Sequence, residues 1–231
     1  MIHLFKRLEV TTLALMAGVG AAMWTFLALS DEVSENSTSA FDQAIMLAFR
    51  APGHPSDPIG SRAFEESMRD ITALGGFTVL TLITIIAAAA LIYFRRRRQA
   101  AVFIGTILIA QVASESLKVM FNRPRPDLVP HGVYVYSQSF PSGHSLLSAA
   151  TFLTLAAILG GMQSQRRFKI FVFAVAILLT VAIGVSRVYL GVHWPTDVLG
   201  GWTLGAGLAL AARLALGWWK DPGPPETDQE V

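Results

Sequence analysis

The sequence predicts an all-α membrane protein, a polytopic bundle of about six transmembrane helices with a short interfacial helix in its first external loop. Hydrophobic residues make up 53% of the 231 residues and charged residues only 15%, well below the roughly 25% of soluble domains. The apolar residues come in long blocks rather than in the alternation of a half-buried strand. We expect one membrane-embedded domain over residues 1–220, followed by a disordered cytoplasmic tail over residues 221–231.

Six blocks have the length of about 20 apolar residues that a helix needs to cross a bilayer. They lie near residues 9–29, 71–94, 100–120, 145–163, 168–186 and 196–217. The first block follows two basic residues and ends in Ala28-Leu29-Ser30, so a cleaved signal peptide is the alternative. Its apolar run is longer than the roughly 7–15 residues of a signal peptide, and we therefore expect a retained span.

Residues 31–70 form the longest external loop and contain three prolines. From Ile59 to Ile71 the apolar side chains follow one face of a helix, with Glu65, Glu66 and Arg69 off that face. Such an amphipathic segment is typical of a helix that lies on the membrane surface.

The basic residues outside the candidate site predict the orientation. If the spans alternate, most of them fall on one side of the bilayer, which by the positive-inside rule is the cytoplasm. This side contains Lys6, Arg7, Arg95 to Arg98, Arg166, Arg167, Lys169 and Lys220. Both chain ends are then cytoplasmic, and the opposite side is the periplasm if the protein belongs to the inner membrane of a Gram-negative bacterium.

Three polar clusters occur where apolar blocks meet loops. They read Lys118-x6-Arg125-Pro126, Pro141-Ser142-Gly143-His144 and Ser186-Arg187-x5-His193-x3-Asp197. Two spans separate the second cluster from the third, so the chain crosses the membrane and returns between them. All three clusters are therefore expected at one membrane face.

The residue types of these clusters suit a phosphate group. Ser142 and Gly143 precede a span, where the free N–H groups of a helix N-terminus attract anions. Arginine forks bind phosphate oxygens in bidentate fashion and lysine adds a compact charge, which is the expected role of Lys118, Arg125 and Arg187. Snorkelling interface residues are the alternative for any single cluster.

His193 and Asp197 are four residues apart, which places them on the same face of a helical turn. The carboxylate can accept the proton of one imidazole nitrogen and leave the other nitrogen free. An imidazole oriented in this way is a candidate nucleophile. His144 is then the candidate general acid for the leaving oxygen.

The three clusters together resemble the signature of the type 2 phosphatidic acid phosphatase family, which shares its site with vanadium haloperoxidases. Every defined position of that signature is matched between residues 118 and 197, and the six-span layout resembles the bacterial membrane-bound branch. The resemblance implies that His193 attacks phosphorus and forms a phosphohistidine, that Asp197 orients it, and that His144 protonates the leaving group and later activates water.

The resemblance further implies phosphate binding by Lys118, Arg125, Ser142, Gly143 and Arg187, with neither a metal nor another cofactor. Two residues near these motifs are expected to be accessory. Arg123 also fits a phosphate site, although the motif spacing selects Arg125, and Glu115 lies one turn before Lys118, where a salt bridge is the simplest role.

The expected partners are the lipid bilayer and a lipid phosphate substrate, whose tail stays in the membrane while its head reaches the cations; no nucleic acid is expected. Phosphatidic acid, phosphatidylglycerol phosphate, undecaprenyl pyrophosphate and lipid A phosphate all remain candidates, and the sequence leaves the oligomeric state open. A phosphotransferase that passes the phosphoryl group to another lipid would use the same site.

Other classes of function explain the sequence less well. A serine hydrolase based on Ser142 would not need three cations, and the Gly-x-Ser-x-Gly elbow is missing. A metal site of His144, His193 and Asp197 would suffer repulsion from the neighbouring cations. A transporter could use Gln111, Ser114 and Glu115 within the third span, and a lipid-binding relative without activity would be expected to have lost part of the signature.

Overall fold

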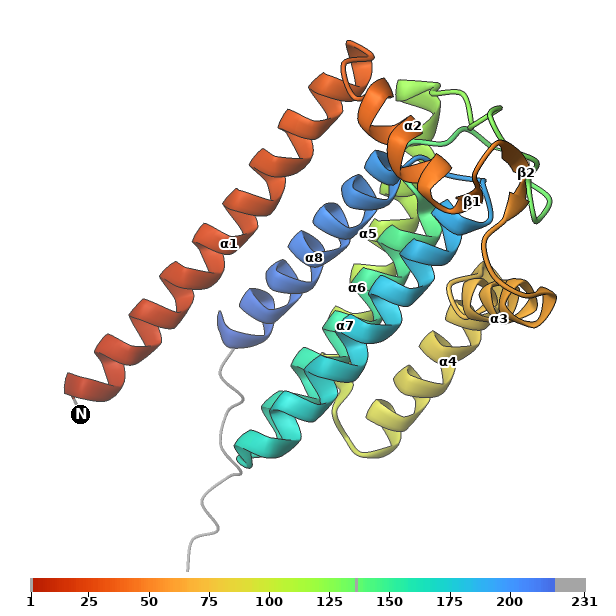
Figure 1. Cartoon of the computed structure of the whole chain (residues 1–231). Helices are drawn as coiled ribbons and strands as arrows, with labels where there is room; N and C mark the ends of the chain where they lie inside the picture. The colour runs from red at the N-terminus through yellow and green to blue at the C-terminus, as the bar shows by residue number, and fades with distance from the viewer. Residues whose placement is uncertain (1, 136, 219–231) are drawn as a thin grey trace, which may run out of the picture.

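The protein is described by a computed structural model covering residues 2–135 and 137–218, within which long helices run side by side (Figure 1). The predicted tail over residues 221–231 lies outside the described residues. The elements are α1 (Ile2–Ser34), α2 (Ser39–Ala48), β1 (Arg50–Ala51), β2 (His54–Pro58), α3 (Arg62–Ala73), α4 (Phe77–Tyr93), α5 (Arg97–Phe121), α6 (Gly143–Met162), α7 (Arg166–Tyr189) and α8 (Pro195–Trp218).

The prediction of about six spans is confirmed. Within the described residues, five helices are long and apolar enough to cross a membrane, namely α1 and α5 to α8. The sixth candidate is the pair α3 and α4, which is bent by 48°. The predicted short helix of the first loop is α3, whose N-terminus is capped by Ser61, the side chain of which accepts a hydrogen bond from Phe64 N.

The predicted second span at residues 71–94 begins later than expected, because the chain bends between α3 and α4. Gly75 lies in this bend, where a Cβ atom would collide with Ile183 of α7 and lie 3.3 Å from the His144 ring. A residue without a side chain therefore lets the bend approach α7 and the start of α6 closely.

The loop over residues 31–70 is more ordered than the sequence indicated. Residues expected to be loop form α2 and an antiparallel pair of short strands, β1 and β2. The helix α2 is held by a tertiary contact, because its buried Asp42 accepts hydrogen bonds from the backbone and side chain of Thr196 at the start of α8. Spacing within the loop could not predict this contact.

The helix α6 lies at the centre of the bundle and packs against α5, α7 and α8. On α8, Gly201 and Gly205 face α6 so closely that a Cβ atom at either position would lie within 2.8 Å of α6 atoms. The loop before α6 is anchored by Phe140, whose buried ring lies between Phe26 and Phe121 at centroid distances of 5.8 and 5.0 Å. This packing fixes the position of the Pro-Ser-Gly-His segment.

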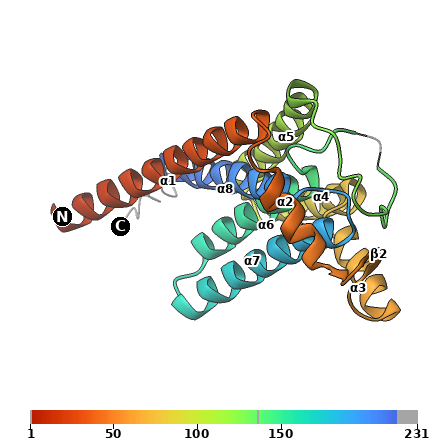
Figure 2. The ribbon, with the colours of Figure 1, turned by 45° about the horizontal axis from the view of Figure 1, so that its top comes forward.

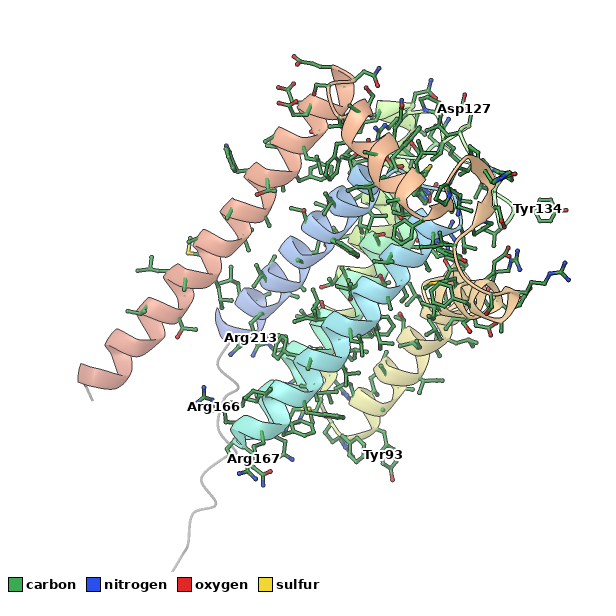
Figure 3. The ribbon with its side chains drawn as sticks, viewed as in Figure 1. Tyr93, Asp127, Tyr134, Arg166, Arg167 and Arg213 are labelled. Atoms are coloured by element: carbon green, nitrogen blue, oxygen red, sulfur yellow. The ribbon has the colours of Figure 1, made fainter. Side chains whose placement is uncertain are left out.

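The two ends of the bundle differ in character. At one end lie α2, the strands and the loop between α5 and α6, near the labelled Asp127 and Tyr134 (Figure 3). At the other end lie Tyr93, Arg166, Arg167 and Arg213 (Figure 3). We call this second end, with its three labelled arginines, the basic end. In both ribbon views α1 runs along α8 at the edge of the bundle (Figures 1 and 2).

Candidate active site

The three sequence clusters meet at the end of the bundle that holds α2 and the strands. Lys118 comes from the last turn of α5, Ser142 and His144 from the start of α6, and Arg187 from the last turn of α7. His193 lies in the short connection between α7 and α8. The helices run antiparallel through the bundle, so these separate chain segments reach one place.

His193 is buried, with 1% of its surface exposed, and both of its ring nitrogens have partners. Its Nδ1 lies 3.3 Å from Asp197 Oδ2, and its Nε2 lies 3.2 Å from Arg125 Nη1. A guanidinium can only donate, so the contact with Arg125 requires a lone pair on Nε2. The proton of the ring is then on Nδ1, which donates to Asp197, and His193 is a neutral imidazole with its lone pair directed at the cations.

The environment favours this neutral form of His193. Burial lowers the pKa of its imidazole well below the ordinary value, and the positive charges of Arg187, Arg125 and Lys118 lower it further. Both effects act in the same direction, because each penalises an added positive charge. The ring therefore retains its Nε2 lone pair at neutral pH.

Arg125 is fixed by the loop that follows it. Its Nε donates to Ser137 O at 2.6 Å, and its Nη1 donates to Val192 O at 2.6 Å as well as facing His193. Burial lowers the pKa of Arg125, and the nearby Asp197 opposes that change. Backbone carbonyls thus hold the guanidinium plane beside the imidazole, a fixed geometry that suits a planar donor.

Lys118 and Gly143 are in close contact. A Cβ atom added to Gly143 would lie 3.3 Å from Lys118 Nζ and 3.1 Å from Ser114 Oγ. Lys118 Nζ also donates to Ser137 Oγ at 3.2 Å. Ser142 is the N-cap of α6, and its Oγ accepts from Ser145 N at 3.4 Å. The ammonium group therefore lies directly beside the free N-terminus of α6, where an anion is favoured.

Arg187 is a buried cation without a carboxylate partner in the part of the chain that the structure describes. It is 4% exposed, and its Nη1 donates to Thr72 Oγ1 at 2.9 Å. Its Nε has no hydrogen-bond acceptor among the described residues. An uncompensated buried charge is costly unless an anion neutralises it, so this residue points to an anionic ligand.

His144 follows Gly143 in the first turn of α6 and is partly buried. Its ring lies against Gly75 of the bend between α3 and α4. Within the described residues the side chain of His144 makes no hydrogen bond, so its ring nitrogens remain available to a ligand. The bend therefore forms one wall of the site.

The two accessory residues occupy different positions. Glu115 is mostly exposed and pairs with Lys118 at 3.7 Å, a distance typical of a weak surface salt bridge. Arg123 does not belong to the group of cations around His193. Its guanidinium joins two buried carboxylates, Asp42 at 2.7 Å and Asp197 at 2.6 Å.

Sequence reasoning missed four residues that contact the site. Asp42 binds Arg123, Thr72 binds Arg187, Ser137 binds both Lys118 and Arg125, and Thr196 binds Asp42 and Arg123. None belongs to a motif, and the first two lie in the long first loop and its helix. Of these four residues, only Thr196 lies directly beside a motif residue, Asp197, so only its position could have suggested a role in the site.

The histidines and carboxylates of the site are residue types that could also bind a metal ion. Among residues 2–135 and 137–218, no group of three or more His, Asp or Glu side chains is placed to hold a metal ion. The positive charges of Lys118, Arg125 and Arg187 act on both histidines, and the one carboxylate beside His193, that of Asp197, is paired with Arg123. The residue set of the site therefore suits an anion rather than a divalent cation.

Comparison with known proteins agrees with this arrangement. The chain is 33% identical over 181 residues to phosphatidylglycerophosphatase B of Bacillus subtilis, covering 78% of this chain and 85% of that protein. It is 32% identical over 106 residues to an undecaprenyl-diphosphatase of Sulfolobus acidocaldarius, covering 44% and 47% of the two chains.

Solved structures give the same relationship. The crystal structure of the transmembrane PAP2 type phosphatidylglycerolphosphate phosphatase from Bacillus subtilis superposes with a TM-score of 0.76 at 31% identity, covering 84% of this chain and 93% of that chain. Aquifex aeolicus LpxE superposes with a TM-score of 0.53 at 28% identity, covering 67% and 87%. The model of the PAP2 superfamily matches residues 99–221, which contain all three motifs. This protein therefore belongs to the PAP2 superfamily and is an integral membrane lipid phosphatase.

Proposed function

We propose that the protein hydrolyses the phosphomonoester or pyrophosphate of a membrane lipid through a phosphohistidine at His193. The observation that carries the proposal is the position of His193, whose Nδ1 faces Asp197 while its Nε2 lone pair faces Arg125. A neutral, oriented imidazole among buried cations is a suitable nucleophile for phosphorus.

In the first step, His193 Nε2 forms a bond to phosphorus and the bond from phosphorus to the leaving oxygen breaks. Protonated His144 donates its proton to that oxygen, and Asp197 stabilises the positive charge that develops on the His193 ring. In the second step, His144 accepts a proton from water, whose oxygen attacks phosphorus, and the P–N bond breaks to release inorganic phosphate. His144 thus gives up one proton in the first step and regains one from water in the second.

The cations supply the electrostatic stabilisation. Lys118, Arg125 and Arg187 would bind the phosphoryl oxygens together with the N-terminus of α6 at Ser142 and Gly143, in the manner of an oxyanion hole. Arg125 would exchange its contact with Nε2 for a phosphate oxygen when substrate binds. We assign Arg123 and Asp42 a positioning role, because Arg123 pairs with Asp197 and Asp42 pairs with Arg123.

We propose that the site opens to the outer side of a bacterial inner membrane, with both chain ends in the cytoplasm. The distribution of charge supports this orientation, because Arg166, Arg167 and Arg213 lie at the end of the bundle away from the site (Figure 3). Residues 1–220 would then act as one membrane-embedded phosphatase domain, with the loop over residues 31–70 outside.

Phosphatidylglycerol phosphate is the substrate that we propose first, because a relative named for that activity matches most of both chains. Relatives named as undecaprenyl-diphosphatase and lipid A 1-phosphatase match about half of this chain. Undecaprenyl pyrophosphate, lipid A phosphate and phosphatidic acid are therefore the comparison substrates.

The test is phosphate release by the purified protein from these four lipids, with His193→Ala as the inactive control. Phosphatidylglycerol phosphate is expected to have the highest kcat/KM. Brief reaction with labelled lipid phosphate, followed by alkaline quench, is expected to trap an acid-labile phosphoryl group on wild type and none on His193→Ala. Labelled phosphate that appears mainly on a second lipid would instead identify a phosphotransferase.

A further inference from the structure

An apolar groove lies at the basic end of the bundle, far from the catalytic motifs. Four helices, α1, α6, α7 and α8, form its walls, and its volume is about 480 Å³. Aliphatic and aromatic side chains contribute most of the surface. They include Leu15, Leu153, Ala157, Phe173, Ala206 and Leu210.

A second depression, of about 360 Å³, adjoins this groove and has the opposite character. Its lining includes Arg96, Arg98 and Gln99 from the start of α5 and the segment before it. The apolar groove and this polar depression share Ala157, Gly161 and Arg213, so they meet over the end of α6. The result is one cavity with an apolar lobe and a basic lobe.

The charges around this cavity all have the same sign. Arg96, Arg98, Lys169 and Arg213 line it, and no Asp or Glu is among the described lining residues. The side chains of Lys169 and Arg213 form neither a hydrogen bond nor an ion pair with any other described residue. Arg98 differs, because its guanidinium donates to Ala215 O at 2.8 Å and Leu216 O at 2.6 Å, which fixes a positive charge at the end of α8.

The junction between the two lobes is open. An added Cβ atom at Gly161 would have no heavy atom of the described residues within 4 Å, so residues 2–135 and 137–218 leave the space beside it open. The neighbouring Gly160 is different, because Lys169 Cγ would lie 3.7 Å from such an atom. The stem of Lys169 therefore packs against α6 while the groove beside it stays unfilled.

We propose that this cavity binds an anionic glycerophospholipid of the surrounding bilayer, as a structural lipid separate from the substrate. The phosphate would lie between Arg213, Lys169 and the arginines of the basic lobe, and an acyl chain would follow the apolar groove between α1 and α8. Charge complementarity selects this occupant. Arg96, Lys169 and Arg213 line the cavity, and no acid is among its described lining residues, which favours a lipid with net negative charge over a zwitterionic lipid. An apolar groove inside a membrane bundle favours a lipid over a soluble anion.

Native mass spectrometry of the full-length protein in detergent, with equal amounts of phosphatidylglycerol and phosphatidylcholine added, tests the proposal. The double variant Lys169→Gln/Arg213→Gln is expected to retain about tenfold less phosphatidylglycerol than wild type. The control is Arg166→Gln/Arg167→Gln, which removes the same charge at the same end from residues that do not line the cavity. Phosphatidylglycerol bound at the catalytic end would be equally present in both variants.

A second pair of variants tests the cavity without changing charge. Gly161→Leu places a side chain at the junction of the lobes and is expected to reduce retention of phosphatidylglycerol at least fivefold. Gly105→Leu is the matched control on α5, where an added Cβ atom also meets no neighbour within 4 Å. Equal retention by all four variants, equal losses in the variants and their controls, or equal binding of phosphatidylcholine would overturn the proposal. Because the readout is binding, these outcomes are independent of catalysis.

Discussion

The carboxylates of Asp42 and Asp197 share one guanidinium. Arg123 Nη2 donates to Asp42 Oδ2 at 2.7 Å, and Arg123 Nη1 donates to Asp197 Oδ1 at 2.6 Å. The other oxygen of Asp197 faces His193 Nδ1. The helix α2, in the loop over residues 31–70, is therefore linked through two buried ion pairs to the imidazole that we propose as the nucleophile.

The first prediction concerns Asp42. Asp42→Asn removes the charge that holds Arg123, so Asp197 and His193 lose part of their positioning. We expect kcat to fall about tenfold to hundredfold with little change in KM, because small misplacements at a reacting group have effects of this size. Steady-state kinetics with a lipid phosphate measures both constants.

Glu66→Gln is the control for this variant, since Glu66 is an exposed acid of the same loop region and its one ion pair among the described residues is with Arg69 at 2.5 Å. It is expected to keep wild-type kinetics. A tenfold rise in KM for Asp42→Asn with unchanged kcat would contradict a positioning role and would indicate direct substrate binding.

The second prediction concerns the tautomer of His193. Asp197→Asn removes the acceptor of the Nδ1 proton and the charge that stabilises the protonated ring. In Ser-His-Asp triads, replacing the carboxylate that orients the imidazole leaves the ring in the wrong tautomer and lowers kcat by about 10⁴. We therefore expect kcat to fall by about 10³ to 10⁴ in Asp197→Asn. His193→Ala should abolish turnover, and tryptophan fluorescence should show that both variants remain folded. Near-normal kcat in Asp197→Asn would remove Asp197 from the mechanism.

The third prediction is a pH dependence. The pKa of His193 is lowered well below its usual value of about 6.5, so protonation, which removes the nucleophile, occurs only at lower pH. The acidic limb of kcat/KM due to His193 is therefore expected well below pH 6.5. The free energy of unfolding depends on pH in the same direction. The part of it that comes from neutral His193 is complete above about pH 6.5 and is lost as the pH falls through the folded-state pKa.

Arg125→Gln tests the cause of that shift. Removing one of the charges that lowers the pKa of His193 should raise this pKa, so the acidic limb should move toward pH 6.5 while kcat/KM falls. Profiles of kcat/KM against pH for the two proteins give the comparison. An acidic limb near pH 6.5 in wild type that stays in place in Arg125→Gln would disprove this electrostatic account.

The fourth prediction concerns Gly143. Gly143→Ala would place a Cβ atom 3.3 Å from Lys118 Nζ, which forces the ammonium group away from the N-terminus of α6. We expect kcat/KM to fall about tenfold with a thermal midpoint close to that of wild type, because the flexible lysine can move. Gly105→Ala, which meets no neighbour within 4 Å, is the control and should leave kcat/KM unchanged.

The fifth prediction concerns metal ions. Because protein cations would stabilise the phosphoryl charge, excess EDTA is expected to leave phosphate release unchanged. Vanadate should inhibit competitively, since it adopts the five-coordinate geometry of the reacting phosphorus. Activity that disappears with EDTA and returns with a divalent cation would refute metal-independent catalysis.

Much of this protein is predictable from local properties of its sequence. The lengths of the apolar blocks predicted the spans because the bilayer sets a fixed length for a helix. The contact between His193 and Asp197 was expected from their four-residue spacing, although His193 lies in the connection just before α8 and not in a helical turn. Lys118, Arg125 and Arg187 were expected near them from the direction of the spans. The amphipathic pattern around Met68 likewise predicted α3.

Other features depend on contacts between residues far apart in the chain. The pairing of Asp42 with Arg123, the hydrogen bond from Arg187 to Thr72, and the close approach of Gly75 to His144 have no local signal. Each results from how helices pack, which is decided by side-chain shape over the whole bundle rather than by spacing. Local sequence patterns account for the membrane spans and for the residue types of the three motifs. Residues such as Asp42 and Thr72, which hold the motif side chains in position, are known only from the tertiary structure. The reason is that long-range packing brings them to the site from other parts of the chain.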